Sequence, residues 1–370
     1  MEQYTILQVI GGLNRGGAET MLMNLYRKLD RTKFKFVFLT YNAGKQDDYD
    51  QEIYDNGDEI IKINGNHQSN PILLYRDLKQ IMNNRHFDCV HAHTLFNSAV
   101  AMVVAKQANV KVRITHSHSS GVMKKNNLIN RTYFAISRYL IKKDSTHFVA
   151  CDQKSGEYLF GTPFKGIVLK NGVDLTKFNP TTKVKYELDE NLSKPNKIKL
   201  AAISSFYTVK NHKFMIEIAK RLDEKKIDFV MYFVGRGPLQ AEIENKIAEY
   251  HLEKKVILLG VLNNVNELLP GLDFVLMPSL YEGLPVSLIE AQASGVPAII
   301  STNISKDVDL KMGLIDFLEI ENNYDEWVDH ILESKAQKVT NPEYIKNVFI
   351  KNGYSVEKNL EKICKVYEGE

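Results

Sequence analysis

Short apolar runs alternate with amphipathic stretches along most of the chain. Residues 5–10 form the first apolar run, residues 11–17 a glycine-rich turn, and residues 18–29 carry apolar side chains at helical spacing. Further strands are predicted at residues 34–40, 60–63, 89–93, 112–116 and 147–151. Alternation of this kind predicts an α/β fold with a parallel sheet covered by helices on both faces.

The alternation pauses at about residues 174–196 and then resumes. Strands are predicted at residues 199–203, 229–234, 256–259, 274–277 and 298–301, with helices between several of them. We therefore expect an N-terminal Rossmann-like domain (1–180), a linker (181–196), a C-terminal Rossmann-like domain (197–350) and a terminal helix (351–370). That helix is expected either to lie on the surface or to cross back to the first domain.

Size and composition agree with two soluble domains. The 370 residues suit two domains of roughly 150–200 residues each, and a net charge of +3 gives no reason to expect nucleic acid as a partner. The three cysteines are far apart in the sequence, which argues against a disulfide framework or a zinc site. The chain starts without a signal-like segment, and no apolar stretch reaches about 18 residues, so we expect a cytoplasmic protein.

The segment from residue 271 to 301 is the most informative part of the chain. A buried strand is predicted at 272–277, a loop at 278–283, and a helix that starts near Pro285, which suits a first helical turn. The free backbone N–H groups at the start of such a helix, together with the helix dipole, form an anion site. Residues 283–287 are therefore predicted to bind a diphosphate.

Two carboxylates accompany this loop. Glu282 lies on the loop and Glu290 is one and a half turns into the helix, which places the two groups roughly 10 Å apart. A carboxylate accepts hydrogen bonds in pairs, which suits the neighbouring hydroxyls of a ribose or hexose. The alternative is that both are solvated surface charges.

Several further motifs precede this segment or lie within it. They are the glycine-rich loop 11–17, a histidine pair near residue 116, N-G-V-D at 171–174, Lys210, V-G-x-G-P at 234–238, and the two glutamates. With these motifs the sequence resembles, over its whole length, the family 4 glycosyltransferases, which are retaining enzymes with the GT-B fold. The segments GGLNRGGAET and YEGLPVSLIEA are similar to those of enzymes that build bacterial capsule or exopolysaccharide.

The resemblance implies roles for individual residues. It implies that Glu290 holds the ribose, that Glu282 lies near the hydroxyls of the donor sugar, and that Lys210 binds the phosphates and offsets the leaving-group charge. It also places Glu282, Lys210 and His118 in catalysis. The remaining donor-binding positions that it implies are Gly16, Gly17, Ser205, Gly235, Gly283, Leu284, Pro285, Val286 and Ser287.

One position departs from the family pattern. The family usually has an arginine five residues before the lysine, whereas this chain has Ser205. Arg236, inside the V-G-x-G-P motif, is a candidate substitute, because the family more often has an acidic residue there.

Residues of the first domain are also expected to contact the donor or the acceptor. Gly16 and Gly17 would allow the backbone to approach the donor diphosphate or the acceptor, although loop 11–17 could also be only a tight turn. Its spacing fits a dinucleotide fingerprint poorly. By the resemblance, His118 lies close to the transferred sugar, with His116 as the second choice. His91 and His93 are expected to be structural.

Three further features have weaker readings. The acidic triplets at 48–50 and 307–309 are common by chance, so we expect no metal and no other cofactor. Residues 123–143 interleave basic and apolar side chains, which suits either an ordinary domain helix or a peripheral contact with the inner face of an anionic membrane.

The alternation predicts two Rossmann-like domains, and the resemblance implies that they face each other across a cleft in a retaining glycosyltransferase. The resemblance also implies a nucleoside-diphosphate sugar as the donor, with uridine as the base, and a saccharide or an undecaprenyl-diphosphate-linked saccharide as the acceptor. Three alternatives stay open: a sugar-nucleotide epimerase of similar architecture, a nicotinamide-dependent oxidoreductase, and a partner subunit with little catalytic activity.

Overall fold

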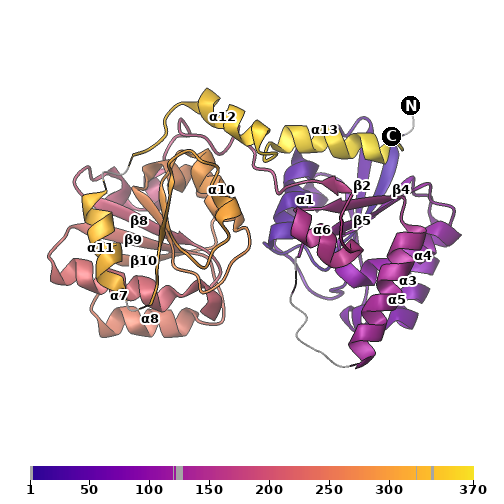
Figure 1. Ribbon diagram of the computed structural model, residues 1–370, viewed down its shortest axis with the longest axis horizontal. Coiled ribbons are helices and arrows are strands. Elements are labelled where there is room, and N and C mark those ends of the chain that lie inside the picture. Colours follow the sequence, from indigo (N-terminus) through magenta and orange to yellow (C-terminus); the bar gives the residue numbers. More distant parts are fainter. Residues whose placement is uncertain (1–2, 120, 122–127, 322, 335–336) are drawn as a thin grey trace. The chain divides into compact units, whose positions relative to one another are not determined.

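The chain folds into two compact units. The computed structural model describes residues 3–119, 121, 128–321, 323–334 and 337–370. The first unit comprises Met1–Gly172 with Gly353–Glu370, and the second comprises Val173–Asn352 (Figure 1). Each unit has its own parallel sheet covered by helices, as the alternation of apolar runs predicts.

The first unit is built on a seven-stranded parallel sheet with the order β3-β2-β1-β4-β5-β6-β7. The strands run over Tyr4–Val9 (β1), Phe34–Thr40 (β2), Glu59–Lys62 (β3), Cys89–Ala92 (β4), Val112–Ser117 (β5), His147–Ala150 (β6) and Ile167–Val168 (β7). Strand β1 lies between β2 and β4, so it is central and buried.

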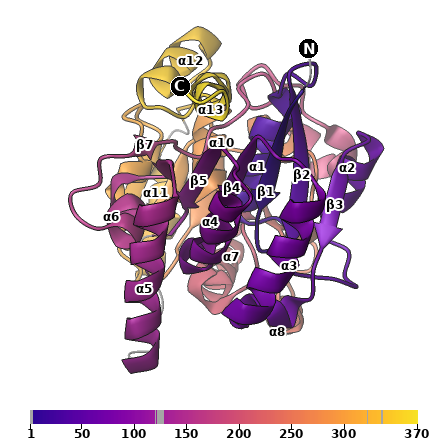
Figure 2. The same cartoon turned by 90° about the vertical axis from the view of Figure 1, so that its right-hand side faces the viewer.

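Helices cover both faces of this sheet. Residues of α1 (Gly17–Lys28) and α13 (Val356–Tyr367) share one hydrophobic cluster with the sheet, and those of α3 (Pro71–Asn84) and α4 (Ser98–Gln107) share another. Helices α3, α4 and α5 (Leu128–Asp144) lie side by side in that order (Figure 2). Two shorter helices, α2 (Asp50–Asp55) and α6 (Gln153–Phe160), complete the unit.

The strand periodicity explains the two clusters. Successive side chains of a strand point to opposite faces. In β1, Ile6 belongs to the cluster under α1 and α13, whereas Leu7 and Val9 belong to the cluster under α3 and α4. Gln8 therefore points toward the face that α13 covers.

The last helix, α13, packs in the core of the first unit. Ser355 accepts a hydrogen bond from the amide of Lys358 at its N-terminus, and the Asn359 side chain donates to the carbonyl of Lys170 at 2.8 Å. Tyr367 is fully buried. Of the two expectations for the C-terminal segment, the structure shows the helix that returns to the first unit. The preceding helix, α12 (Pro342–Lys351), contacts α10 in the second unit.

The second unit is built on a six-stranded parallel sheet with the order β10-β9-β8-β11-β12-β13. Its strands run over Ile198–Ile203 (β8), Phe229–Val234 (β9), Val256–Gly260 (β10), Phe274–Met277 (β11), Ala298–Ser301 (β12) and Ile315–Leu318 (β13). Its further helices are α7 (His212–Glu224), α8 (Gln240–Glu249), α9 (Val265–Leu268), α10 (Val286–Ala293) and α11 (Tyr324–Glu333).

The stretch expected as a linker, residues 181–196, lies inside the second unit. Leu192 is buried, and the Tyr232 hydroxyl donates to the Asp189 carboxylate at 3.0 Å. These contacts hold the stretch against β9, so it is packed rather than extended between the units. The boundary between the units falls between Gly172 and Val173.

Both sheets have a point at which the strand order reverses. β1 pairs with β4 in the first unit and β8 pairs with β11 in the second. After β8 the chain enters α7, which shares a cluster with α11, whereas after β11 it enters α10 on the α12 side. Ligands of open α/β sheets bind at such points, outside the carboxyl ends of the strands.

No described helix combines the length and the apolar character that crossing a bilayer requires.

Candidate functional site

In the second unit, two loops meet at the strand-order reversal. One follows β8 and includes a short 3-10 helix, Thr208–Lys210, and the other follows β11. The amide of Leu280 donates to the carbonyl of Val209 at 2.8 Å, and the Asn211 side chain donates to the carbonyl of Pro278 at 3.1 Å. These bonds tie the loops together and fix what they carry.

Each loop contributes one charged side chain to the junction. The Lys210 ammonium forms an ion pair with the Glu282 carboxylate, and only 17% of each side chain is exposed. The Glu282 backbone is held as well, because its carbonyl accepts from the amide of Ser305 at 3.2 Å. The predicted phosphate-binding cation and the predicted sugar-binding carboxylate thus contact each other directly.

The helix that follows the β11 loop starts one residue later than predicted. Pro285 is its N-cap residue, with extended backbone (φ −68°, ψ 120°), and α10 begins at Val286. The first N–H groups of a helix have no partner within the helix, so those of Val286 and Ser287 are available to a ligand. A Cβ added at Gly283 would meet no atom within 4 Å, so the approach to these amides is open there.

Glu290 lies farther along α10 and is half-buried. Its neighbours Leu288, Ile289 and Ala291 are buried in the unit. Glu282 thus precedes the start of α10, on the loop, and Glu290 follows it, on the helix.

A second glycine loop lies against the end of β8. The amide of Phe206 donates to the carbonyl of Arg236 at 3.0 Å, which brings the 235–237 loop against residues 204–206. A Cβ on Gly235, where φ is 144°, would lie 2.1 Å from the carbonyl oxygen of Ser204. Only glycine permits this approach. Ser205 and Arg236 both have exposed side chains at the crossing.

Neutral polar groups lie beneath these loops. The His212 ring is buried, with its Nε2 3.4 Å from the Ser204 hydroxyl. Burial, and secondarily the charge of Lys210, lowers the pKa of His212 to about 4. Ser279 is fully buried, and its hydroxyl has no hydrogen-bond partner among the described residues.

In the first unit, the glycine-rich loop follows β1. Gly16 is the N-cap residue of α1, and Gly17 opens the helix. The loop is held by Asp47, whose carboxylate accepts from the amide of Leu13 at 2.6 Å and from the Asn14 side chain at 2.7 Å. The two glycines thus sit at the carboxyl end of β1, beside the strand-order reversal.

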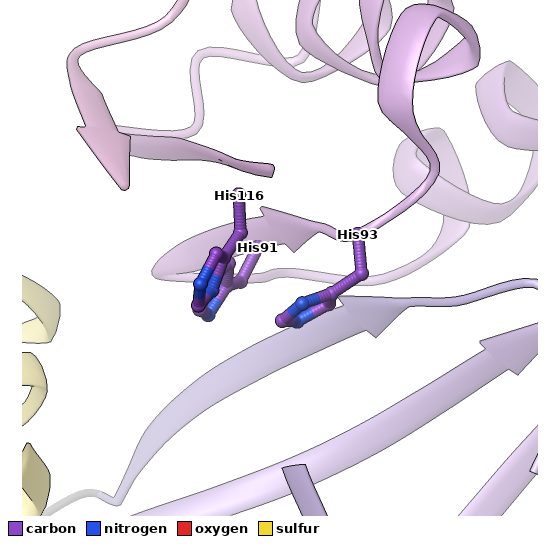
Figure 3. Close-up of side chains that lie close together, drawn as sticks. All are labelled: His91, His93 and His116. Atoms are coloured by element: carbon purple, nitrogen blue, oxygen red, sulfur yellow. The ribbon is translucent and has the colours of Figure 1, made fainter. Parts of the chain in front are cut away.

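Four histidines lie at the carboxyl ends of β4 and β5, next to this loop. His91 and His93 belong to the end of β4, and His116 and His118 to the end of β5. Positions two apart share a face, and the register pairs Gln8 with His91 and His91 with Ile114, so all four rings gather on the α13 side. Figure 3 shows three of them close together.

Two hydrogen-bonded chains connect these rings. One runs from Gln8 to His93 (3.0 Å) and from His93 Nδ1 to His118 Nε2 (2.8 Å). The other runs from the Tyr367 hydroxyl to His91 Nδ1 (3.0 Å) and from His91 Nε2 to His116 Nδ1 (3.2 Å). Gln8 also donates to the Tyr367 hydroxyl at 3.1 Å, which joins the chains. Gln8 and Tyr367 were not among the predicted site residues.

The histidines are held neutral. Burial lowers the pKa of His91 to about 3 and that of His118 to about 4. Burial also lowers the pKa of His93 and of His116 well below the ordinary value of 6.5, and the neighbouring rings add to the shift. The polar network is therefore uncharged at neutral pH, in contrast to the ion pair of the second unit.

Metal-type ligands gather in one place within the described part of the chain. Ligating atoms of His91, His93 and His116 lie within 4.8 Å of one another. Neutral imidazoles are suitable zinc ligands, but both ring nitrogens of His91 and both of His93 already make hydrogen bonds, which binding to zinc would replace. Their arrangement is that of a hydrogen-bonded network.

The acidic triplet at 48–50 is used within the fold. Asp50 is buried, accepts from the amide of Asp47 at 2.7 Å and pairs with Lys62 at 2.5 Å. Asp309, of the second triplet, pairs with Lys311 at 2.8 Å.

Comparison with known proteins agrees with this architecture. The family model of glycosyl transferases group 1 matches residues 141–356, and that of glycosyltransferase family 4 matches residues 15–177. The chain is 36% identical over 373 residues to EpsF of Bacillus subtilis, named as a glycosyltransferase, covering 99% of this chain and 96% of EpsF. It is 27% identical over 307 residues to a UDP-Gal:alpha-D-GlcNAc-diphosphoundecaprenol alpha-1,3-galactosyltransferase of Escherichia coli, covering 80% of this chain and 78% of that enzyme.

Solved structures show the same fold. Anabaena Alr3699/HepE in complex with UDP and glucose has a TM-score of 0.74, with 99% of both chains covered at 16% identity. A glycosyltransferase from Rickettsia africae has a TM-score of 0.76, with 100% of this chain and 99% of that chain covered at 20% identity.

The two parallel sheets and these matches define a glycosyltransferase with the GT-B fold, as the resemblance predicts. The chain belongs to the family of glycosyl transferases group 1, and its N-terminal part matches glycosyltransferase family 4.

The buried histidines predict a specific acid sensitivity. Because their pKa values in the folded protein, about 3 for His91 and about 4 for His118, lie below 6.5, the unfolded chain binds more protons at pH values in between. Above pH 6.5 these histidines therefore do not change the free energy of unfolding. As the pH drops from 6.5 toward 4, they lower it by up to about 1.4 kcal/mol per pH unit for each histidine.

Thermal unfolding of the wild type and of His91→Phe between pH 7.5 and 4.5 tests this. The unfolding midpoint of the wild type should fall more steeply with acid than that of the variant, because the variant has one fewer buried imidazole. Parallel curves would contradict the assignment.

Proposed function

We propose that the protein is a retaining glycosyltransferase that transfers a sugar from a UDP-sugar to a saccharide or undecaprenyl-diphosphate-linked saccharide in surface polysaccharide synthesis. The observation that carries this proposal is the junction of the β8 and β11 loops. It combines a lysine, a glutamate and a helix N-terminus at the strand-order reversal of one sheet.

The diphosphate would be bound by the start of α10 and by Lys210. The amides of Val286 and Ser287 and the dipole of α10 favour an anion, and Gly283 leaves room for it. Gly283, Leu284, Pro285, Val286 and Ser287 border it in this arrangement. Glu282 keeps Lys210 in place before the donor binds, and it can then accept from hydroxyls of the sugar. Glu290 would hold the ribose.

The proposed transfer step retains the configuration at the anomeric carbon. The bond between the anomeric carbon and the diphosphate oxygen breaks while the acceptor oxygen bonds to that carbon on the same face. The acceptor proton passes to the departing phosphate oxygen. Lys210 and the α10 amides stabilise the negative charge that develops on the diphosphate, so the step as proposed does not need a metal ion. By the resemblance, His118, Gly16 and Gly17 of the first unit are further candidate contacts of the substrate.

Relatives support the finer parts of the proposal. The name of the E. coli relative specifies a UDP-linked donor and a diphosphoundecaprenol acceptor. Alr3699/HepE was crystallised in complex with UDP-glucose. A Staphylococcus aureus relative, 26% identical over 311 residues, is named as the capsular polysaccharide biosynthesis glycosyltransferase CapH.

Helix α5 supports a peripheral contact with a membrane surface. Ile136 and Tyr139 are 54% and 63% exposed, and Lys142 and Lys143 follow on the exposed side of the same helix. Apolar side chains next to cations suit an anionic lipid surface. Residues 123–127 of the predicted basic stretch lie outside the described residues.

Replacing Glu290 with Ala should weaken donor binding. Losing a carboxylate that accepts two ribose hydroxyls should cost about 1.5–3 kcal/mol, which raises the Kd of UDP roughly ten- to hundredfold. Isothermal titration with UDP measures the change, and Glu333→Ala, at the end of α11, is the control. An unchanged Kd in Glu290→Ala would overturn the assignment. Incubation with the donor alone separates transfer from epimerisation.

Arg236 should supply the phosphate cation that Ser205 does not. The 235–237 loop is bonded to residues 204–206, so a guanidinium at position 236 can reach the region that an arginine at position 205 would occupy. Arg236→Ala should raise the Kd of UDP about tenfold, and Ser205→Arg in that background should restore most of the loss. If Arg236→Ala binds UDP as the wild type does, Arg236 has no such role.

The α5 surface should bind anionic vesicles. Ile136→Ser with Tyr139→Ser should release most of the protein from phosphatidylglycerol vesicles in a sedimentation assay, since each buried apolar side chain contributes about 1.5–3 kcal/mol. Ile72→Ser is the matched control, because Ile72 is 74% exposed on a different helix, α3. Equal vesicle binding by the double variant and the wild type would rule out this surface.

A further inference from the structure

The histidine network of the first unit contains two buried nitrogen atoms to which the described residues make no hydrogen bond. His116 Nε2 and His118 Nδ1 have no hydrogen-bond partner among the described residues. The two rings are stacked, with centroids 4.0 Å apart, at the carboxyl end of β5. Buried polar atoms nearly always have a partner, so an orphan atom in a candidate site points to a ligand.

The orientation of the Gln8 amide sets which nitrogen of His118 carries the proton. Gln8 donates through its amide nitrogen to the Tyr367 hydroxyl, so its amide oxygen faces His93. An amide oxygen can only accept, and therefore His93 carries its proton on Nε2. The Nδ1 atom of the neutral His93 ring is then an acceptor, and His118 Nε2 must donate to it. His118 is left with a bare lone pair on Nδ1.

The second chain runs past His118 without a hydrogen bond to it. The Tyr367 hydroxyl is buried and its pKa is raised well above the ordinary value, chiefly by burial, so it keeps its proton. By donating to His91 Nδ1 it makes His91 Nε2 the donor to His116. His116 then keeps its own proton on Nε2. A substitution at His91 should therefore leave the tautomer of His118 unchanged, and it can serve as a control for a substitution at His93.

We infer that Gln8 and His93 are positioning residues that fix His118 in the Nε2–H form, so that its Nδ1 accepts a hydrogen bond from a hydroxyl of the bound substrate. This inference rests on the proposed function, which places the reacting sugar beside His118. It adds a specificity: the group at His118 must be a hydrogen-bond donor. A carboxylate or an ether oxygen at the same place could not form a hydrogen bond, because it has no proton to donate to the Nδ1 lone pair.

The structural cost of this arrangement explains its selectivity. A buried acceptor without a partner is destabilising, and a substrate hydroxyl that donates to it removes that penalty on binding. A substrate that lacks the hydroxyl leaves the acceptor unpaired, and sites built around such a bond discriminate strongly. The tautomer must therefore be set before the substrate arrives.

The tautomer of His118 can be observed directly. Long-range proton–nitrogen correlation spectra of the full-length protein, ¹⁵N-labelled on histidine, distinguish Nδ1–H, Nε2–H and doubly protonated rings. The His118 signal is assigned by its absence in His118→Asn. At pH 7 we expect His118 in the Nε2–H form, with Nδ1 unprotonated. A His118 ring protonated on Nδ1, alone or together with Nε2, would overturn the inference.

A matched pair of variants tests the positioning role. His93→Phe removes the acceptor for His118 Nε2, whereas His91→Phe makes the same substitution in the other chain. We expect Nδ1–H to appear at His118 only in His93→Phe, with kcat lowered about tenfold and the Kd of UDP unchanged. His93→Gln, whose amide oxygen can still accept, should retain the Nε2–H form. Equal His118 spectra in the two phenylalanine variants would count against a role for His93.

The outcomes separate this inference from the proposed function. If the wild type binds UDP and transfers sugar but His118 is protonated on Nδ1, only the inference fails. If the wild type does not bind UDP, the proposed function fails, whatever the His118 spectrum shows. Should His93→Phe not fold, the wild-type spectrum together with His93→Gln decides the question.

Discussion

The pairing of β8 with β11 is the constraint on which the candidate site depends. The two strands are far apart in the sequence, and their parallel register joins Phe274 to Leu200 and Val275 to Ala201. Parallel pairing places both carboxyl ends on the same edge of the sheet, and the helices that follow leave on opposite faces. The loops that carry Lys210 and Glu282 therefore meet there, and a change in this register would separate the ion pair.

The two units present different electrostatics at their strand-order reversals. The second unit offers a lysine, carboxylates and the start of α10, which together suit a charged and hydroxylated ligand. The first unit offers neutral imidazoles that can exchange hydrogen bonds with hydroxyls but add no charge. This division agrees with the proposed transfer, in which negative charge develops on a diphosphate and neutral sugar hydroxyls are held by hydrogen bonds.

Local signals in the sequence were sufficient for much of this architecture. The apolar runs at 5–10 and 274–277 are strands within about one residue of their predicted bounds. The loop before α10 contains Gly283 and ends at Pro285, as predicted from these two residues. Strands β7 and β13 carry no clear local signal, because β7 has two residues and β13 has an exposed aspartate among its four. The unit boundary lies before the predicted linker, and the packing of Leu192 within the second unit depends on residues distant in the sequence.

The histidine network shows the same limit at a candidate site. The sequence places the four histidines at strand ends, but their tautomers depend on Gln8 and on Tyr367, which lies 359 residues further along the chain. A glutamine inside an apolar strand was a usable signal, because a buried amide must find partners. The partner itself could not be read from any local pattern.

The return of α13 to the first unit is therefore part of the chemistry of that unit and not only of its packing. Gln8 has an amide nitrogen and an amide oxygen to satisfy, and its oxygen faces His93. Its nitrogen donates to the Tyr367 hydroxyl, and this bond holds the amide in the observed orientation. With another side chain at position 367, the amide could face either way, each unpaired group costing about 1–3 kcal/mol, and the proton on His93 would no longer be determined. The last turn of the chain thus sets the hydrogen-bonding character of a ring at the end of β5.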